Sequence, residues 1–87
     1  AVGRVQRTFQ DFVVDVTFSG NLLVVKTLPG SAQVVAAALD GLQLESVAGT
    51  VAGDDAVLVV AKDGRPEPSS PAARELFKEF LAWRQKG

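Results

Sequence analysis

Two adjacent aspartates, Asp54 and Asp55, stand between two apolar runs of an 87-residue chain. Carboxylates about 5 Å apart repel each other by roughly 3 kcal/mol at an effective dielectric constant near 20. Water screens most of this repulsion at an exposed turn, whereas a partly desolvated pair needs a cation nearby, either a Lys or Arg side chain or a cationic ligand. The pair therefore predicts either an ordinary surface turn or a cation site.

A second polar pair, Gln33 and Asp40, lies in a segment with helical periodicity. Residues seven positions apart project from the same side of a helix, and Ala36 and Ala37 lie between the two. Small side chains between two polar ones let a ligand or a partner come close to the helix. An ordinary solvated helix face shows the same pattern, so both interpretations stay open.

The composition restricts the chemistry that these residues can perform. The chain has neither Cys nor His, which excludes thiolate nucleophiles, disulfides, histidine acid-base catalysis and the usual zinc sites. An enzyme that held Mg²⁺ on Asp54 and Asp55 for phosphoryl transfer would also need a phosphate-binding glycine loop and a base, and neither accompanies the pair. We therefore expect a binding domain without metal or cofactor, and not an enzyme.

Charge and hydropathy indicate the partners. Nine basic and ten acidic residues give a net charge of -1 without a basic stripe, so these residues are not expected to bind DNA directly. The apolar fraction of 47% and the mean hydropathy of +0.20 exceed what a small monomer hides, which predicts self-association. No apolar run is long enough to span a bilayer, and we expect a cytoplasmic protein. The absence of Met suggests a piece of a longer protein.

The elements that position the two polar pairs follow from periodicity and turn signals. Residues 1–10 show no sustained period and predict a linker or a frayed lead-in, followed by one domain over residues 11–87. Alternation predicts a first strand from Phe12, with Phe12, Val14, Val16 and Phe18 toward the core and Val13, Asp15 and Thr17 on the opposite face.

The rest of the chain completes one strand-strand-helix unit and then predicts a second one. Ser19-Gly20-Asn21 predicts a turn into a second strand that ends near Thr27, and a helix follows from Ser31 to about Leu42 with Val34, Val35, Ala38 and Leu39 on its apolar face. Two more strands over residues 46–61 flank the Asp54-Asp55 turn, and the unbroken apolar run from Val57 to Val60 predicts a central strand covered on both faces. A loop over residues 62–69 precedes an N-cap at Ser70 and a helix to about Gln85, whose aromatic stripe predicts core packing. We therefore predict an α+β fold of order ββαββα, a four-stranded antiparallel sheet with both helices packed on one face.

Two segments carry a resemblance to a known family. Thr27-Leu28-Pro29-Gly30-Ser31-Ala32-Gln33 is similar to a Thr-x-Pro-Gly-Ala-Ala-Gln segment, and Gly49-Thr50-Val51-Ala52-Gly53-Asp54-Asp55 is similar to a Gly-Thr-Ile-Ala-Gly-Asp-Asp segment. With Asp40 at the matching place, residues 10–85 resemble the C-terminal domain of bacterial arginine repressors. The sequence departs from that pattern at Ala56, where the family usually has Thr, in a shorter segment before Gly49, and in a longer loop after Asp63.

The resemblance implies a domain that forms trimers, two of which stack into a hexamer with the co-repressor L-arginine bound between them. It implies that the parent protein is a transcriptional repressor of arginine biosynthesis or catabolism genes. An N-terminal winged helix-turn-helix domain, absent from this sequence, would bind operator DNA. Two alternatives stay open: an oligomerisation module that binds another cationic amino acid, and one that binds no ligand.

The resemblance also implies the ligand site. A guanidinium matches a carboxylate through two parallel hydrogen bonds, and Asp54 is the expected partner for an arginine held mainly by the opposing trimer. The amino-acid end of the ligand would contact Gln33, Thr50, Ala52 and Asp55, where an amide and backbone groups suit its carboxylate and an acidic side chain suits its α-amino group. Asp40 would complete the wall of the site.

Overall fold

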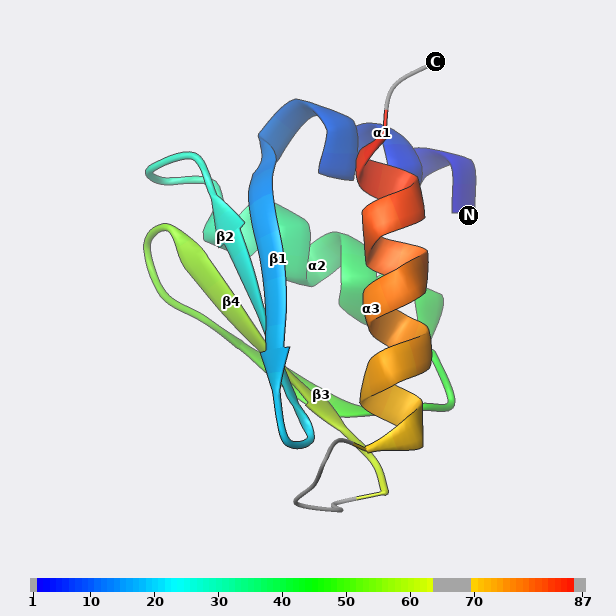
Figure 1. Ribbon diagram of the computed structural model, residues 1–87. Coiled ribbons are helices and arrows are strands. Elements are labelled where there is room, and N and C mark those ends of the chain that lie inside the picture. Colours follow the sequence, from blue (N-terminus) through cyan, green and yellow to red (C-terminus); the bar gives the residue numbers. More distant parts are fainter. Residues whose placement is uncertain (1, 64–69, 86–87) are drawn as a thin grey trace.

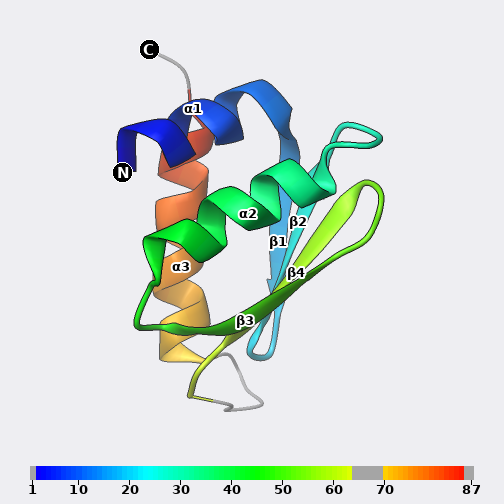
Figure 2. The ribbon, with the colours of Figure 1, turned by 180° about the vertical axis from the view of Figure 1, so that it is seen from behind.

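Residues 2–63 and 70–85 are described by a computed structural model, and over these ranges three helices and four strands follow one another along the chain. Their bounds are α1 (Val2–Phe12), β1 (Val13–Ser19), β2 (Leu22–Thr27), α2 (Ala32–Leu42), β3 (Val47–Ala52), β4 (Ala56–Ala61) and α3 (Pro71–Arg84). The strands form one antiparallel sheet in the order β1-β2-β4-β3. Helices α2 and α3 lie on the same side of this sheet (Figures 1 and 2). The predicted ββαββα fold is confirmed, with α1 added in front of it.

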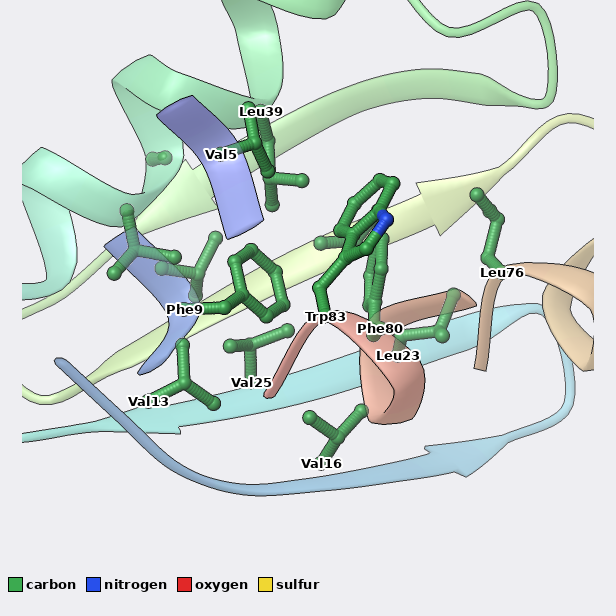
Figure 3. Packing of buried hydrophobic residues seen from close by; sticks show 14 of the residues in the cluster. Val5, Phe9, Val13, Val16, Leu23, Val25, Leu39, Leu76, Phe80 and Trp83 are labelled. Atoms are coloured by element: carbon green, nitrogen blue, oxygen red, sulfur yellow. The ribbon is translucent and has the colours of Figure 1, made fainter. Parts of the chain in front are cut away.

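The chain before β1 is a helix, so the expected linker or frayed lead-in is wrong for residues 2–10. Val5 and Phe9, four residues apart on one side of α1, are 2% and 0% exposed. The ring of Phe9 lies 5.3 Å from that of Phe80 and 5.4 Å from that of Trp83 (Figure 3). Two buried side chains among polar neighbours make too short a pattern to recognise in the sequence. The helix is stabilised by its packing on α2 and α3, not by a local signal.

A bulge near the start of β1 changes the predicted alternation of that strand for Val13 and Val14. Between Val13 and Asp15 the register against β2 shifts by one residue, and a bulge of this kind turns the following side chains relative to the preceding ones. As a result Val13 is buried and Val14 is 47% exposed, opposite to the prediction. Beyond the bulge the prediction is confirmed, because Val16 is buried and Thr17 is exposed. Arg84 at the end of α3 donates hydrogen bonds from its guanidinium to the carbonyl oxygens of Val13 and Val14. Phe12 belongs to α1 and not to the strand.

Helices α2 and α3 begin as the sequence predicts. The Ser70 hydroxyl accepts a hydrogen bond from the backbone N–H of Ala73 at 2.8 Å, and Pro71 follows at the first helical position. Ser31 occupies the N-cap of α2 without a side-chain hydrogen bond. The aromatic stripe of α3 is core, as predicted, whereas Val34 of α2 is 50% exposed although it was expected on the apolar face. The buried face of α2 instead includes the small side chains of Ala32 and Ala36.

Much of the sheet face opposite the helices is apolar and exposed among the described residues. Register pairs place Thr17, Val24, Leu58 and Val51 side by side in one row across the four strands. Leu58 is 41% exposed and Val51 66% exposed. Strand β4 is therefore central, as predicted, but the expectation that both of its faces are covered is wrong within this single chain. We call this surface the open face; it comprises Thr17, Leu22, Val24, Val51, Leu58 and Val60.

Candidate functional site

The turn that carries Asp54 and Asp55 is fixed by backbone hydrogen bonds to the connection between β2 and α2. The N–H of Thr27 donates to the Asp55 carbonyl oxygen at 2.8 Å, and the N–H groups of Gly30 and Ala32 donate to the Asp54 carbonyl oxygen at 3.1 and 3.3 Å. Gly30 adopts φ +80°, a left-handed conformation that favours glycine. The turn backbone is thus held at the start of α2 while both aspartate residues are exposed.

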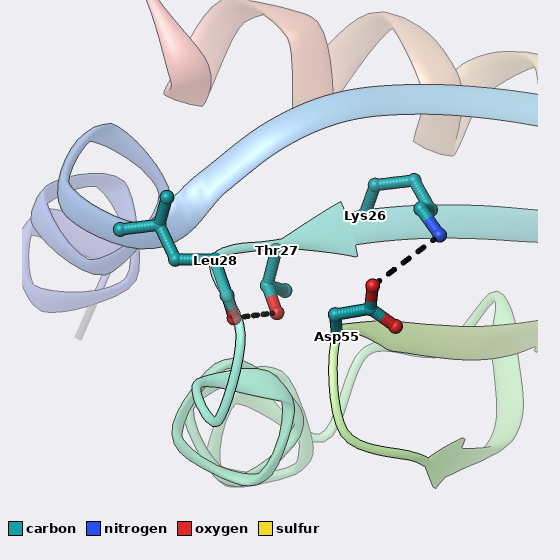
Figure 4. Close-up of polar contacts among 4 residues, drawn as sticks. All are labelled: Lys26, Thr27, Leu28 and Asp55. Carbon is teal, nitrogen blue, oxygen red and sulfur yellow. Dashed lines mark hydrogen bonds and ion pairs between the residues drawn. The ribbon is translucent and has the colours of Figure 1, made fainter.

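The two neighbouring carboxylates have different surroundings. The Asp55 Oδ2 lies 3.8 Å from the Lys26 Nζ, and both side chains are about half exposed (Figure 4). Within the described part of the chain, the Asp54 side chain forms neither an ion pair nor a hydrogen bond. The like charges of the turn are therefore partly balanced at Asp55, and Asp54 keeps a carboxylate available to a cation.

Lys26 was not among the predicted site residues. Its position follows from the alternation of β2, in which Val25 and Thr27 are buried and Lys26 is exposed on the open side. In the register of the sheet Lys26 pairs with Ala56, the residue that follows Asp55. A prediction that residues 26 and 56 pair across the two strands would have placed Lys26 next to Asp55.

A second polar contact joins α2 to β3. The Thr50 Oγ1 donates a hydrogen bond to the Asp40 Oδ1 at 2.9 Å. Asp40 lies in the last turn of α2, and Thr50 lies in β3, which is an edge strand of the sheet. The sequence placed both residues in the site, and the structure brings them into direct contact.

The remaining predicted residues lie along the same edge of the molecule. Gln33 is exposed in the first turn of α2, next to Ala32, whose N–H reaches the Asp54 carbonyl. Ala52 is half-buried at the end of β3. Only Asp55 departs from this arrangement, because its carboxylate is directed to Lys26 on the open side of the sheet. The other five candidates lie on α2, on β3 and in the turn, and we call the surface that they line the open wall.

The hollows of the surface do not coincide with this wall. A shallow one of about 170 Å³ touches the wall at Asp40 and runs between the end of α2 and the start of β3. A larger one of about 390 Å³ lies between α1 and α2 and includes none of the predicted residues; it is lined by Arg4, Val5, Ala37, Ala38, Gly41 and Leu42. Neither of these two hollows encloses the wall.

Residues 2–63 and 70–85 show neither a metal site nor a membrane-spanning helix. No group of three or more His, Cys, Asp or Glu side chains there is placed to hold a metal ion. Among the helices of the same ranges, none has the length and apolar character needed to cross a membrane.

Comparison with known proteins gives the family. A family model described as "Arginine repressor, C-terminal domain" matches residues 9–80. The chain belongs to this family. The matched range of the arginine repressor C-terminal domain contains all six predicted site residues and Lys26, and it confirms the resemblance inferred from the two sequence segments.

Curated relatives are similar over most of the chain. The arginine repressor of Alkaliphilus oremlandii is 46% identical over 78 residues, which cover 90% of this chain and 50% of that protein. The arginine repressor of Carboxydothermus hydrogenoformans is 43% identical over 81 residues, with 93% and 52% covered. The arginine repressor of Halothermothrix orenii is 49% identical over 57 residues, with 66% and 38% covered. The chain thus spans about half the length of the curated arginine repressors it matches.

Proposed function

We propose that this domain binds L-arginine between two trimers and thereby stabilises a hexamer. It acts as the effector-binding and oligomerisation part of an arginine-responsive transcriptional repressor in the cytoplasm, which controls genes of arginine biosynthesis or catabolism. Operator DNA is contacted by another domain of the longer protein. The family match and the names of the relatives support this role.

The observation that carries the proposal is the Asp54 carboxylate. Its backbone is anchored to the start of α2 by two hydrogen bonds, and its exposed side chain makes no hydrogen bond or ion pair within the described ranges. A guanidinium is always charged and offers a planar fork of donors to such a carboxylate. Asp54 is therefore the residue that we assign to the side chain of the ligand.

The shape of the wall favours a site between subunits. Its residues lie along an edge, and the two hollows described above do not enclose them. A second copy of the chain would supply the opposite wall. In this arrangement Asp54 reaches an arginine held mainly by the opposing trimer. The amino-acid end of the ligand contacts Gln33, Thr50, Ala52 and Asp55, and Asp40, held by Thr50 at 2.9 Å, completes the wall.

The open face supports assembly of the trimer. Leu58 and Val51 lie next to each other on this face and are both exposed in the single chain. Contiguous exposed apolar side chains on one sheet face are typical of an interaction surface, and copies of the same chain are the partner that the family relation favours.

The binding of arginine at a trimer-trimer interface shifts the assembly equilibrium. A ligand that binds only the assembled state stabilises it by RT ln(1 + [L]/Kd) per site. In the free hexamer, Asp54 and Asp55 from several subunits crowd one interface, and bound arginine replaces their repulsion with charge pairs. The fraction of the protein in the hexameric state therefore rises with the concentration of arginine.

Calorimetric titration with L-arginine, with L-lysine as a second cationic amino acid, tests the proposal. The Asp54→Asn variant should bind L-arginine more weakly by about 2 to 5 kcal/mol if the pair is buried in the complex. Asp11→Asn, which removes an exposed carboxylate from α1, should leave the affinity unchanged.

Three results would contradict parts of this account. Unchanged affinity of Asp54→Asn would remove Asp54 from the site. Preferential binding of L-lysine would favour the alternative of another cationic ligand. No binding of any amino acid would favour a purely structural oligomerisation domain.

A further inference from the structure

Lys26 occupies a position between two acidic residues on the open side of the sheet. Its Nζ lies 3.8 Å from the Asp55 Oδ2 (Figure 4). Across the neighbouring strand pair, Lys26 faces Asp15 of β1 in register. Side chains directly opposite each other in an antiparallel pair have Cβ atoms about 5 Å apart, so the lysine has a second carboxylate within its reach.

We propose that Lys26 competes with the ligand for Asp55. In the ligand-free domain the lysine ammonium occupies the carboxylate that the proposed function assigns to the α-ammonium group of L-arginine. Binding of the amino acid displaces the lysine, which then turns toward Asp15. This inference rests on the proposed function and makes Lys26 a residue that sets the affinity of the site.

A backbone hydrogen bond links the two segments that carry this ion pair, so displacement of the lysine requires only a side-chain movement. The Thr27 N–H donates to the Asp55 carbonyl oxygen at 2.8 Å, which fixes the two chain segments that carry Lys26 and Asp55. The Thr27 hydroxyl donates to the Leu28 carbonyl oxygen at 2.8 Å and leaves Asp55 to the lysine (Figure 4). Both Lys26 and Asp55 are about half exposed, so water replaces the contacts that they lose.

The exposure of the pair also sets the size of the effect. Ion pairs between exposed side chains are weak and are partly screened by water, so the lysine lowers the affinity for the ligand without blocking the site. Its removal acts in two ways that have the same sign. The competing cation disappears, and the charges of Asp54 and Asp55 are left without a nearby counter-charge, which favours a cationic ligand.

The chain offers a matched control in Lys62. Its Nζ lies 3.8 Å from the Glu45 Oε1, the same separation as in the pair of Lys26 and Asp55. Lys62 follows β4 at the end opposite Ala56, about 20 Å away along the strand at the usual rise per residue. Replacement of either lysine by Gln makes the same change in net charge, but only one of them lies beside the proposed site.

The test is calorimetric titration of the full 87-residue chain and its variants with L-arginine. Lys26→Gln should bind about two- to fivefold more tightly than the unmodified chain, the range expected for loss of an exposed ion pair. Lys62→Gln should match the unmodified chain, and Lys26→Arg, which keeps the cation, should restore its affinity. In an Asp55→Asn background, Lys26→Gln should have a smaller effect than in the unmodified chain, because the carboxylate for which the lysine competes is gone and only its long-range effect on Asp54 remains.

Equal affinities of Lys26→Gln and Lys62→Gln would overturn the inference, as would weaker binding by Lys26→Gln, which would make the lysine a supporting contact of the ligand. Both results leave the proposed function intact, because the unmodified chain still binds L-arginine. Absence of binding by the unmodified chain would instead remove the proposed function and this inference with it.

Discussion

Thr50 donates a hydrogen bond from its hydroxyl to the Asp40 carboxylate at 2.9 Å and so ties the last turn of α2 to the edge strand β3. The two residues are ten positions apart in the sequence. Their contact fixes the orientation of an exposed carboxylate on the open wall. It also shows that one part of the proposed site is already formed in a single chain.

Replacement of Thr50 by Val should lower both the stability of the fold and the affinity for arginine. Loss of this exposed hydrogen bond should lower the free energy of unfolding by about 0.5 to 1.5 kcal/mol, and it should also weaken arginine binding because Asp40 is no longer held in place. Thr8→Val is the control, since it removes a comparable bond from the Thr8 hydroxyl to the Arg4 carbonyl oxygen at 3.0 Å. Urea unfolding and calorimetry should show similar stability losses but weaker binding only for Thr50→Val.

A charge placed on the open face should prevent assembly. Val51→Asp introduces a carboxylate beside Leu58, where burial against another subunit would remove it from water. Val14→Asp makes the same change at an exposed valine in the bulge of β1, outside the row of side chains that crosses the sheet. Light scattering should find smaller particles for Val51→Asp and unchanged particles for Val14→Asp. If Val51→Asp assembled normally, the open face would not be the subunit interface.

The two helix N-caps should respond differently to the same substitution. Ser70→Ala removes a fully buried hydroxyl that accepts from the Ala73 N–H at 2.8 Å, so α3 should lose about 1 kcal/mol of stabilisation. Ser31→Ala should have almost no effect, because the Ser31 side chain makes no cap hydrogen bond. The midpoints of urea unfolding test this order of the two variants, and a larger loss for Ser31→Ala would contradict the cap assignment.

Helix α1 should behave as part of the core. Phe9→Ala empties a site that is fully buried against Phe80 and Trp83, and the cost should be about 3 to 5 kcal/mol. Gln6→Ala changes an exposed residue of the same helix and should be close to neutral. Chemical denaturation measures both. Equal stability of the two variants would contradict a core role for α1 and would favour the predicted lead-in.

The sequence predicted the elements that have a regular pattern or a specific turn residue. The hairpin after Ser19, the N-cap at Ser70 and the turn at Asp54 lie where they were expected. The two segments that contain Gln33 and Asp54 also carried the resemblance to the family. Local patterns of this kind depend on neighbouring residues alone, so one sequence is enough to read them.

The features that the sequence did not predict depend on contacts between distant segments. Helix α1 is stabilised through Phe9 by rings more than 70 positions away. The bulge at Val14 is bridged by Arg84 from the far end of the chain. Lys26 becomes the partner of Asp55 only through the pairing of β2 with β4. Each of these three features depends on the tertiary arrangement, which a local sequence pattern does not specify.

Sedimentation velocity of this chain at low micromolar concentration, with and without millimolar L-arginine, tests the central claim most directly. L-lysine serves as the charge-matched control. The account predicts a shift from trimer to hexamer with L-arginine only, since the ligand bridges Asp54 of one trimer to the wall of the other. A monomer under all conditions would contradict both the use of the open face and the binding of arginine between trimers.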